Sequence, residues 1–213
     1  MPGLSSFFWP VNNIIAEMSW LDDNSRKKIR DESAEKMIAE LSTQAESLPV
    51  EETSVIALDW MNGRRTPDAN QALKGAITGL SLGSDAPRIF KALVEATAFG
   101  SKMINERFIS EGLRIDGVIA IGGVAKKNPF VMQIVSDVLN MPIKVAASEQ
   151  TVALGSAMAA SVVAGIHKDI PSAQLAMGGG FETEYHPNRE RAEKYETLFR
   201  KYKELGSFIE KSA

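Results

Sequence analysis

Cysteine is absent from this chain of 213 residues, and histidine occurs only twice. Disulfide bonds and thiolate chemistry are therefore excluded, and a reducing compartment such as the cytoplasm is expected. His167 and His186 lie far apart in the sequence and have no partners at metal-ligand spacing, so no dedicated metal site is expected. No arrangement of serine, histidine and carboxylates is typical of a catalytic centre, and no residue is assigned a catalytic role.

An excess of basic residues is also missing, as are long hydrophobic runs. The formal net charge is −3, and the few basic clusters are not interleaved with aromatic residues, so we expect no nucleic-acid partner. The longest weakly polar run covers residues 152–166, which is too short for a membrane span. With 44% hydrophobic and 24% charged residues, the composition is ordinary for a soluble globular protein, and we expect no membrane partner.

Aromatic residues are few, yet Phe7, Phe8 and Trp9 stand together close to the start of the chain. Chain termini are usually polar, so we expect residues 1–10 to be an interior segment of a longer protein. An apolar arm folded back onto its own domain is the alternative.

Apolar residues recur at helical spacing over residues 11–48, 87–110 and 188–210, which predicts three helical regions. Asp22-Asp23 or Asn24-Ser25 is expected to cap a helix within the first region, and Pro87 to start the second. Residues 54–60 indicate a strand, and residues 73–82 an extended segment interrupted by glycines. Residues 177–180, Met followed by three glycines, indicate a flexible connector.

The middle of the chain predicts an α/β fold. Residues 118–121 are short, apolar and β-branched, as in a buried strand, and Gly122-Gly123 follow at its carboxyl end. Asn128-Pro129 are expected to open a helix to residue 140, followed by a strand over 143–146 and a helix over 151–165. This alternation predicts a sheet with parallel strands and right-handed crossovers.

A strand, a glycine turn and a helix N-terminus together favour an anion site, because glycines let the backbone approach a phosphate. ATP or another nucleotide is therefore the first candidate ligand. A bare Gly-Gly pair also occurs where a chain simply turns, and the chain has neither the dinucleotide fingerprint nor a Walker A loop. Asn128 could lie near a nucleobase or only cap its helix. Lys126 and Lys127 could neutralise phosphate or be solvated in a loop.

Two further features stay open at this stage. Glu95, within the helix of residues 87–110, could be a ligand-binding acid facing a cleft or a surface residue. Residues 152–160 (VALGSAMAA) have little bulk, which favours close approach of another element near a hinge, with ordinary core packing as the alternative.

Several segments together resemble the FGGY carbohydrate kinases of the actin-like ATPase superfamily. Residues 120–129 (AIGGVAKKNP) resemble the adenosine motif, residues 152–160 the second connecting helix, and residues 79–96 the C-terminal signature, where Arg88 departs from the usual acid, amide or histidine. Residues 59–67 (DWMNGRRTP), 96–100 (ATAFG) and 170–173 (IPSA) look like the ribulokinase branch.

The resemblance implies a two-lobed enzyme with ribonuclease H-like lobes that transfers the γ-phosphoryl group of ATP, with Mg²⁺, to a sugar hydroxyl. In the ribulokinase branch this is the 5-hydroxyl of L-ribulose, in arabinose breakdown. By the same resemblance Gly122 and Gly123 contact ribose or α-phosphate, Asn128 lies beside the adenine, and Ala125 and Lys126 line the pocket. The family's catalytic aspartate lies upstream of the segment that residues 3–11 resemble, so the chain alone is expected to be inactive.

The expected fold class is therefore α/β, a partial ribonuclease H-like lobe with helical N-terminal and C-terminal segments. The expected organisation is a helical segment over 1–50, a nucleotide-binding lobe over 51–175, and a connector with a terminal helix over 176–213. Unpaired sheet edges could drive homo-oligomerisation. Another FGGY kinase, acting on xylulose or glycerol, and a non-catalytic nucleotide-binding module of actin fold remain alternatives.

Overall fold

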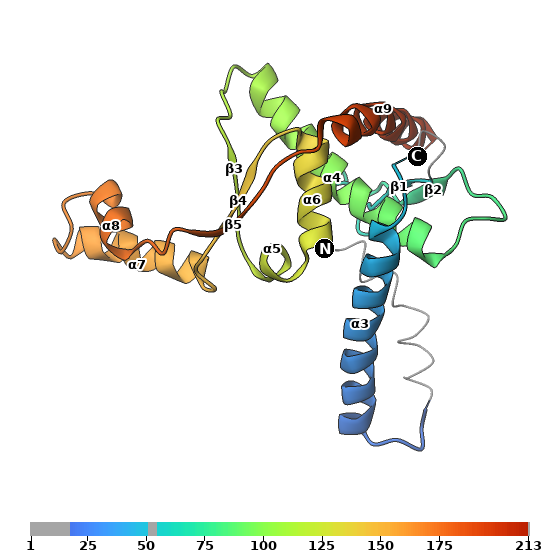
Figure 1. Cartoon of the computed structure of the whole chain (residues 1–213), viewed down its shortest axis with the longest axis horizontal. Helices are drawn as coiled ribbons and strands as arrows, with labels where there is room; N and C mark the ends of the chain where they lie inside the picture. Colours follow the sequence, from blue (N-terminus) through green and yellow to red (C-terminus); the bar gives the residue numbers. More distant parts are fainter. Residues whose placement is uncertain (1–17, 51–54, 213) are drawn as a thin grey trace.

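The computed structural model of the chain describes residues 18–50 and 55–212, so the expectations for residues 1–17 lie outside the described part. Figure 1 shows the arrangement of the elements. The helices are α3 (Asp23–Glu46), α4 (Ala86–Ser110), α5 (Gly123–Lys127), α6 (Pro129–Leu139), α7 (Thr151–Val163), α8 (Ile170–Met177) and α9 (Arg189–Ser212). The strands are β1 (Ile56–Leu58), β2 (Ala76–Thr78), β3 (Val118–Ala120), β4 (Ile143–Ala146) and β5 (Phe181–Tyr185).

The long helices begin where the sequence indicated. Asp22 caps α3 by accepting a hydrogen bond of 2.9 Å from the backbone N–H of Ser25, and Asp85 caps α4, whose first turn holds Pro87. The expected helices over 87–110, 129–140 and 188–210 are confirmed to within about two residues. Of the extended segment expected over 73–82, only β2 is a strand, because the glycines around it interrupt regular pairing.

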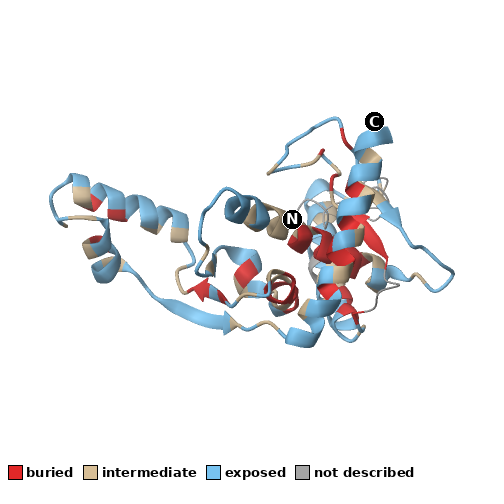
Figure 2. Cartoon of the chain, turned by 90° about the horizontal axis from the view of Figure 1, so that it is seen from above, coloured by how far each residue is buried: buried red, intermediate tan, exposed pale blue. Residues whose placement is uncertain are grey.

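The main core lies between α4, α6, α9 and the short hairpin-like sheet of β1 and β2. Strand β1 is buried along its whole length and pairs antiparallel with β2. Four aromatic rings join α4 to α9, with Phe99 5.8 Å from Phe199 and 5.4 Å from Tyr202 between ring centroids, and Tyr195 against its edge. Figure 2 shows the buried residues concentrated in this half of the molecule.

A second sheet has the order β3-β4-β5. Strands β3 and β4 run parallel and α6 connects them, as the sequence predicted. Strand β5 pairs antiparallel with β4 and was missed, because its alternation of Phe, Thr and Tyr with two glutamates spans only five residues, which are mostly exposed. The expected parallel strands are therefore confirmed for β3 and β4, and the antiparallel strand at this edge was not expected. The strand holds its place through backbone hydrogen bonds, which leave little trace in a sequence.

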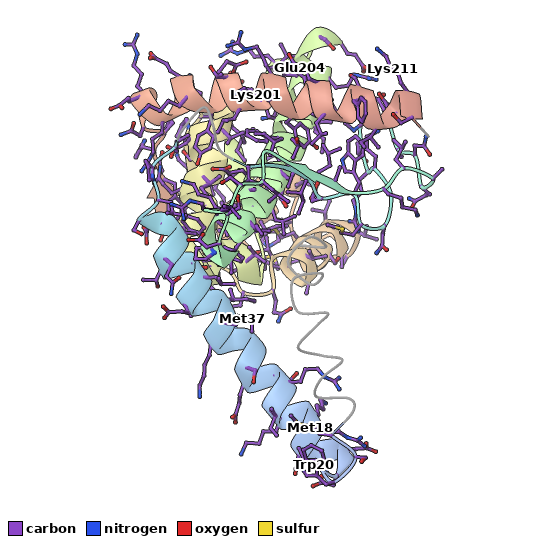
Figure 3. All side chains as sticks on the ribbon, turned by 90° about the vertical axis from the view of Figure 1, so that its right-hand side faces the viewer. Met18, Trp20, Met37, Lys201, Glu204 and Lys211 are labelled. Atoms are coloured by element: carbon purple, nitrogen blue, oxygen red, sulfur yellow. The ribbon has the colours of Figure 1, made fainter. Side chains whose placement is uncertain are left out.

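Two parts extend from this body. Helices α7 and α8 pack on each other and project to one side in Figure 1, with mostly exposed residues in Figure 2. Figure 3 shows α3 running away from the body past Met37 to Trp20 near its far end, while α9 turns Lys201, Glu204 and Lys211 outward. None of the helices within residues 18–50 and 55–212 is long and apolar enough to cross a membrane.

Candidate functional site

The predicted glycine turn lies at the carboxyl end of β3, as expected. Gly122 has φ 87° and ψ 176°, a backbone conformation that only glycine adopts without strain. Gly123 has no such requirement, and a Cβ atom built on either glycine meets no other atom within 4 Å. The turn is therefore shaped by Gly122, while the space in front of both residues is open to a ligand.

The helix that follows the turn is not the one expected. A single helical turn, α5, begins at Gly123 and separates the glycines from Asn128-Pro129, where α6 begins. Lys126 and Lys127 consequently lie in a helix and not in a loop. Because α5 has only five residues, its dipole adds little to an anion site. A phosphate would instead be bound mainly by the open backbone of the glycine turn.

Asn128 is half-buried between α5 and α6, and its side chain caps α6. The backbone N–H of Val131 donates a hydrogen bond of 3.3 Å to its Oδ1 atom. The cap uses only the oxygen of the amide, and the Nδ2 group makes no hydrogen bond within the described chain. The capping role and a contact with a nucleobase are thus compatible, because they use different atoms.

Lys126 and Ala125 have structural partners of their own. The Nζ group of Lys126 donates a hydrogen bond of 2.6 Å to the carbonyl oxygen of Ala147 and lies 3.0 Å from Oε2 of Glu182. These contacts tie α5 to β5 and to the loop after β4. The Ala125 methyl group is buried with Met132 and Ile143, so only its backbone can reach a ligand.

Glu95 is neither on the surface nor free. Its side chain is only 2% exposed, and its Oε1 atom accepts a hydrogen bond of 3.1 Å from the Tyr195 hydroxyl group of α9. Burial raises the pKa of Glu95 to about 7, although Lys91 and the Tyr195 hydrogen bond both act to lower it. The surface alternative is wrong. Glu95 borders a cavity of about 260 Å³, which it shares with Lys91, Arg88 and the loop of residues 79–84.

The small residues of α7 are not core residues in the described chain. Gly155, Ser156 and Ala160 are exposed, and only Met158 and Ser161 are buried in this helix. Core packing was therefore the wrong alternative for most of this segment. Close contact with another element stays a prediction.

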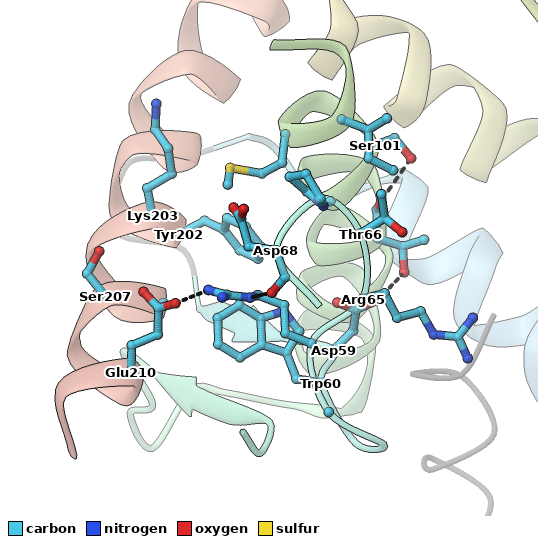
Figure 4. Close-up of a pocket in the computed structure, with 18 residues that line it drawn as sticks. Asp59, Trp60, Arg65, Thr66, Asp68, Ser101, Tyr202, Lys203, Ser207 and Glu210 are labelled. Atoms are coloured by element: carbon cyan, nitrogen blue, oxygen red, sulfur yellow. Dashed lines mark hydrogen bonds and ion pairs between the residues drawn. The ribbon is translucent and has the colours of Figure 1, made fainter. Parts of the chain in front are cut away.

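A larger cavity, of about 410 Å³, lies between α4, α9 and the segment of residues 59–68. Figure 4 shows Lys203, Ser207 and Glu210 of α9 on one side, and Thr66 and Ser101 on the other. From the sequence, residues 59–67 contributed only to the family resemblance, and no site was assigned to their charged side chains. The available signal was an aspartate, Asp59, directly after the buried strand β1.

Asp59 is the most perturbed carboxyl group of this cavity. Its Oδ2 atom accepts a hydrogen bond of 3.2 Å from the Thr97 hydroxyl group, and burial raises its pKa above the ordinary value despite that bond. Burial, together with the nearby charge of Asp59, also raises the pKa of Tyr202 to about 12. The lining of the cavity thus includes a partly desolvated carboxyl group, that of Asp59, and a neutral phenol group, that of Tyr202.

A metal site formed by side chains alone is not present in the described ranges, where no three histidine or carboxylate groups lie together.

The sequence comparisons agree on one family. The model of the C-terminal domain of the FGGY family of carbohydrate kinases matches residues 11–164. The ribulokinase of Vibrio parahaemolyticus is 44% identical over 187 residues, which cover 86% of this chain and 32% of that protein. The ribulokinase of Bacillus licheniformis is 40% identical over 175 residues, covering 80% and 32%. The chain therefore spans about a third of the length of these relatives.

Solved structures share the fold. The xylulose kinase from Rhodospirillum rubrum superposes with a TM-score of 0.74 at 22% identity, covering 98% of this chain and 38% of that one. The glycerol kinase of Plasmodium falciparum with ADP gives a TM-score of 0.64 at 23% identity, covering 78% and 33%. With an α/β lobe common to these kinases and a family model that matches most of its length, the chain belongs to the FGGY family of carbohydrate kinases.

Proposed function

We propose that this chain is the nucleotide-binding lobe of a sugar kinase that transfers the γ-phosphoryl group of ATP to the 5-hydroxyl of L-ribulose. The observation that carries the proposal is the 44% identity to a ribulokinase over 86% of the chain. The xylulose and glycerol kinase neighbours, at 22% and 23% identity, support the fold and do not select the sugar.

The nucleotide site of this proposal is the turn between β3 and α6. Open space in front of Gly122 and Gly123 leaves the backbone accessible to ribose or to the α-phosphate. The free Nδ2 group of Asn128 can donate to an acceptor nitrogen of adenine, while its Oδ1 atom keeps α6 capped. The purine and the phosphates would then lie along one short segment of the chain.

Lys126 and Ala125 complete the site in a supporting role. The Lys126 ammonium has three donors, and two of them are directed to Ala147 and Glu182, which leaves one for a ligand. Its main contribution is to fix α5, and with it the glycine turn, against β5. Mg²⁺ would be held by the phosphates of ATP, and its chemistry is to neutralise the charge that develops during transfer.

Phosphoryl transfer depends on positioning and charge neutralisation between two lobes. As the family resemblance implies, most contacts to the sugar and the catalytic base would come from protein outside this chain. We therefore expect the 213-residue chain to bind nucleotide without phosphorylating ribulose. Ribulose-dependent ADP production by the pure chain would contradict this division of roles.

The alternatives differ in what they bind. A related kinase for another sugar would share the nucleotide site, and only the missing sugar contacts would distinguish it. A non-catalytic module of the same fold would bind nucleotide in a protein that has no catalytic aspartate upstream. Restoring the upstream sequence and measuring sugar-dependent turnover separates these cases.

The test of the proposed site is isothermal titration of the chain with Mg-ATP, adenosine and L-ribulose separately. Saturable binding of Mg-ATP and adenosine supports a formed adenine site. Absence of any nucleotide binding by a chain that unfolds cooperatively would overturn the assignment to residues 122–128.

A further inference from the structure

The cavity between residues 59–68, α4 and α9 has walls that are largely apolar. Its apolar side chains are those of Trp60, Pro67, Met103, Ile104 and Tyr202. On the α4 side Gly100 leaves further room, because a Cβ atom built there would meet nothing within 4 Å. A volume of about 410 Å³ with apolar walls and a few polar groups is typical of a site for a small organic molecule.

Three basic side chains line this cavity, and two of them already have acidic partners. Arg64 is ion-paired with Glu210, and Lys203 lies 3.6 Å from Glu106. Arg65 makes no ion pair with the described part of the chain, and Figure 4 shows its side chain directed away from the two aromatic rings of the lining. The basic groups are therefore poorly placed to hold an anion inside the cavity.

The carboxylate of Asp59 differs from the other acids of the lining. Asp68 and Glu210 are both ion-paired, whereas Asp59 is in no ion pair within residues 18–50 and 55–212. Its Oδ2 atom accepts only the hydrogen bond of 3.2 Å from the Thr97 hydroxyl group among side chains. Burial raises the pKa of Asp59 more than this bond and the charge of Arg65 lower it. A cation bound beside such a carboxylate would stabilise its charged form.

The phenol group of Tyr202 supplies a second acceptor near this carboxylate. Burial, followed by the charge of Asp59, raises the pKa of Tyr202 to about 12, so the hydroxyl group is neutral and its oxygen can accept a hydrogen bond. An ammonium group carries several N–H donors and forms charge-assisted hydrogen bonds with carboxylates. The polar groups of the cavity thus suit an ammonium group, and its apolar walls suit a hydrocarbon body.

We propose that this cavity binds a small organic cation, a primary ammonium ion that carries an apolar body of about the size of a phenethyl group. The ammonium group donates hydrogen bonds to the Asp59 carboxylate and the Tyr202 oxygen, and the apolar body packs against Met103 and Ile104. No lining residue belongs to residues 122–128, so the site is separate from the proposed nucleotide site and does not depend on it.

The test is isothermal titration of the whole chain with phenethylamine, phenethyl alcohol and phenylacetate in separate experiments. The three probes share an aromatic body and differ in a head group that is cationic, neutral or anionic. We expect saturable binding of the amine, binding of the alcohol that is at least about tenfold weaker, and none of phenylacetate. No binding of the amine, equal affinity for amine and alcohol, or a preference for phenylacetate would overturn the proposal.

Asp59→Asn removes the charge and keeps the shape of the side chain. It should weaken binding of phenethylamine at least about tenfold and leave that of phenethyl alcohol nearly unchanged, because only the amine uses the charge. Asp116→Asn makes the same change at a carboxylate that is 70% exposed, and it should bind both probes like the wild type. Wild-type affinity for the amine in Asp59→Asn, or equal weakening of both probes, would contradict the role given to this carboxylate.

Two helix glycines supply a second pair of variants, which tests the location. Gly100→Leu places a side chain in the cavity and should weaken binding of both the amine and the alcohol at least about tenfold by filling the space. Gly155→Leu makes the same change in α7, where a Cβ atom also meets nothing within 4 Å, and should leave both affinities unchanged. Leucine is a better helix former than glycine, so urea unfolding should find neither variant destabilised. Equal amine affinity in the two variants would place the amine outside this cavity and overturn the proposal.

Discussion

The hydroxyl group of Tyr195 in α9 donates a hydrogen bond of 3.1 Å to Oε1 of Glu95 in α4, and both side chains are buried. The bond lies in the main core and joins two residues that are 100 positions apart in the sequence. Burial and the nearby carboxylate raise the pKa of Tyr195 far above its ordinary value, and burial raises the pKa of Glu95 to about 7. The carboxyl group therefore titrates near neutrality inside the core.

Because of this buried pair, we expect the free energy of unfolding to fall as the pH rises. The folded-state pKa of Glu95, about 7, lies above the ordinary value of 4.5, so the folded chain binds the proton more tightly than the unfolded chain. Between pH 4.5 and 7 stability should decline, by about 3 kcal/mol if this group acted alone. Below pH 4.5 the group contributes no difference, since it is protonated in both states.

Urea unfolding of the wild type and Glu95→Gln across pH 5 to 8 checks this expectation. The glutamine variant should show a flatter pH dependence and be the more stable protein at pH 8. Glu111→Gln changes an exposed glutamate at the end of α4 and is the control, with a profile like that of the wild type. Parallel profiles for Glu95→Gln and the wild type would count against the raised pKa.

Among the truncations considered, Asp137→Ala is expected to cause the largest loss of folding stability. Its side chain is 2% exposed, lies 2.7 Å from Nε of Arg191 and accepts hydrogen bonds from the Asn188 backbone and Gln133. Asp137→Ala leaves a buried N–H without an acceptor, so the free energy of unfolding should fall by about 3 kcal/mol.

Asp137→Asn keeps an acceptor and should lose less. Asp116→Ala removes a carboxylate that is 70% exposed and 2.5 Å from Arg114, so its cost should stay below about 1 kcal/mol. Chemical unfolding measures all three. A similar loss for Asp116→Ala and Asp137→Ala would show that burial does not decide the cost.

The two glycines of the turn should respond differently to substitution. Gly122→Ala forces a side chain into a conformation reserved for glycine and should cost about 1–3 kcal/mol of stability. Gly123→Val should leave the unfolding midpoint nearly unchanged, because open space surrounds its Cβ position.

Nucleotide affinity then tests the site itself. Gly123→Val should raise the dissociation constant for Mg-ADP at least about tenfold by blocking close approach, which corresponds to about 1.4 kcal/mol. Gly117→Val, an equally open position before β3, is the matched control and should bind like the wild type. An unchanged dissociation constant for Gly123→Val would remove that residue from the site.

The edge of the second sheet predicts self-association of the chain. Strand β3 has a partner on one side only within the described residues, and Ile119 is 60% exposed. Light scattering should give a mass that rises with concentration, and Ile119→Lys should shift it toward the monomer. A monomeric mass across the concentration range would contradict this expectation.

Local signals in the sequence predicted most of the helices. Asp85 and Pro87 mark the start of α4, and Asn128-Pro129 mark that of α6, because caps and proline act within one turn. Strand β5 and the one-turn helix α5 were missed, since their stability comes from partners distant in sequence. The ion pair of Lys126 with Glu182 spans 56 residues and has no local pattern.

The sequence by itself determined the family, the β3–α6–β4 unit and the glycine turn, because these depend on short-range spacing of residue types. Only the tertiary structure decided that Glu95 is a core acid bonded to Tyr195 and that Asp59 lines a cavity. Burial and cavity shape follow from how α4 and α9 pack, and that packing joins residues about 100 positions apart. No local pattern encodes such a distance, so the chemistry of these two acids becomes visible only in the folded chain.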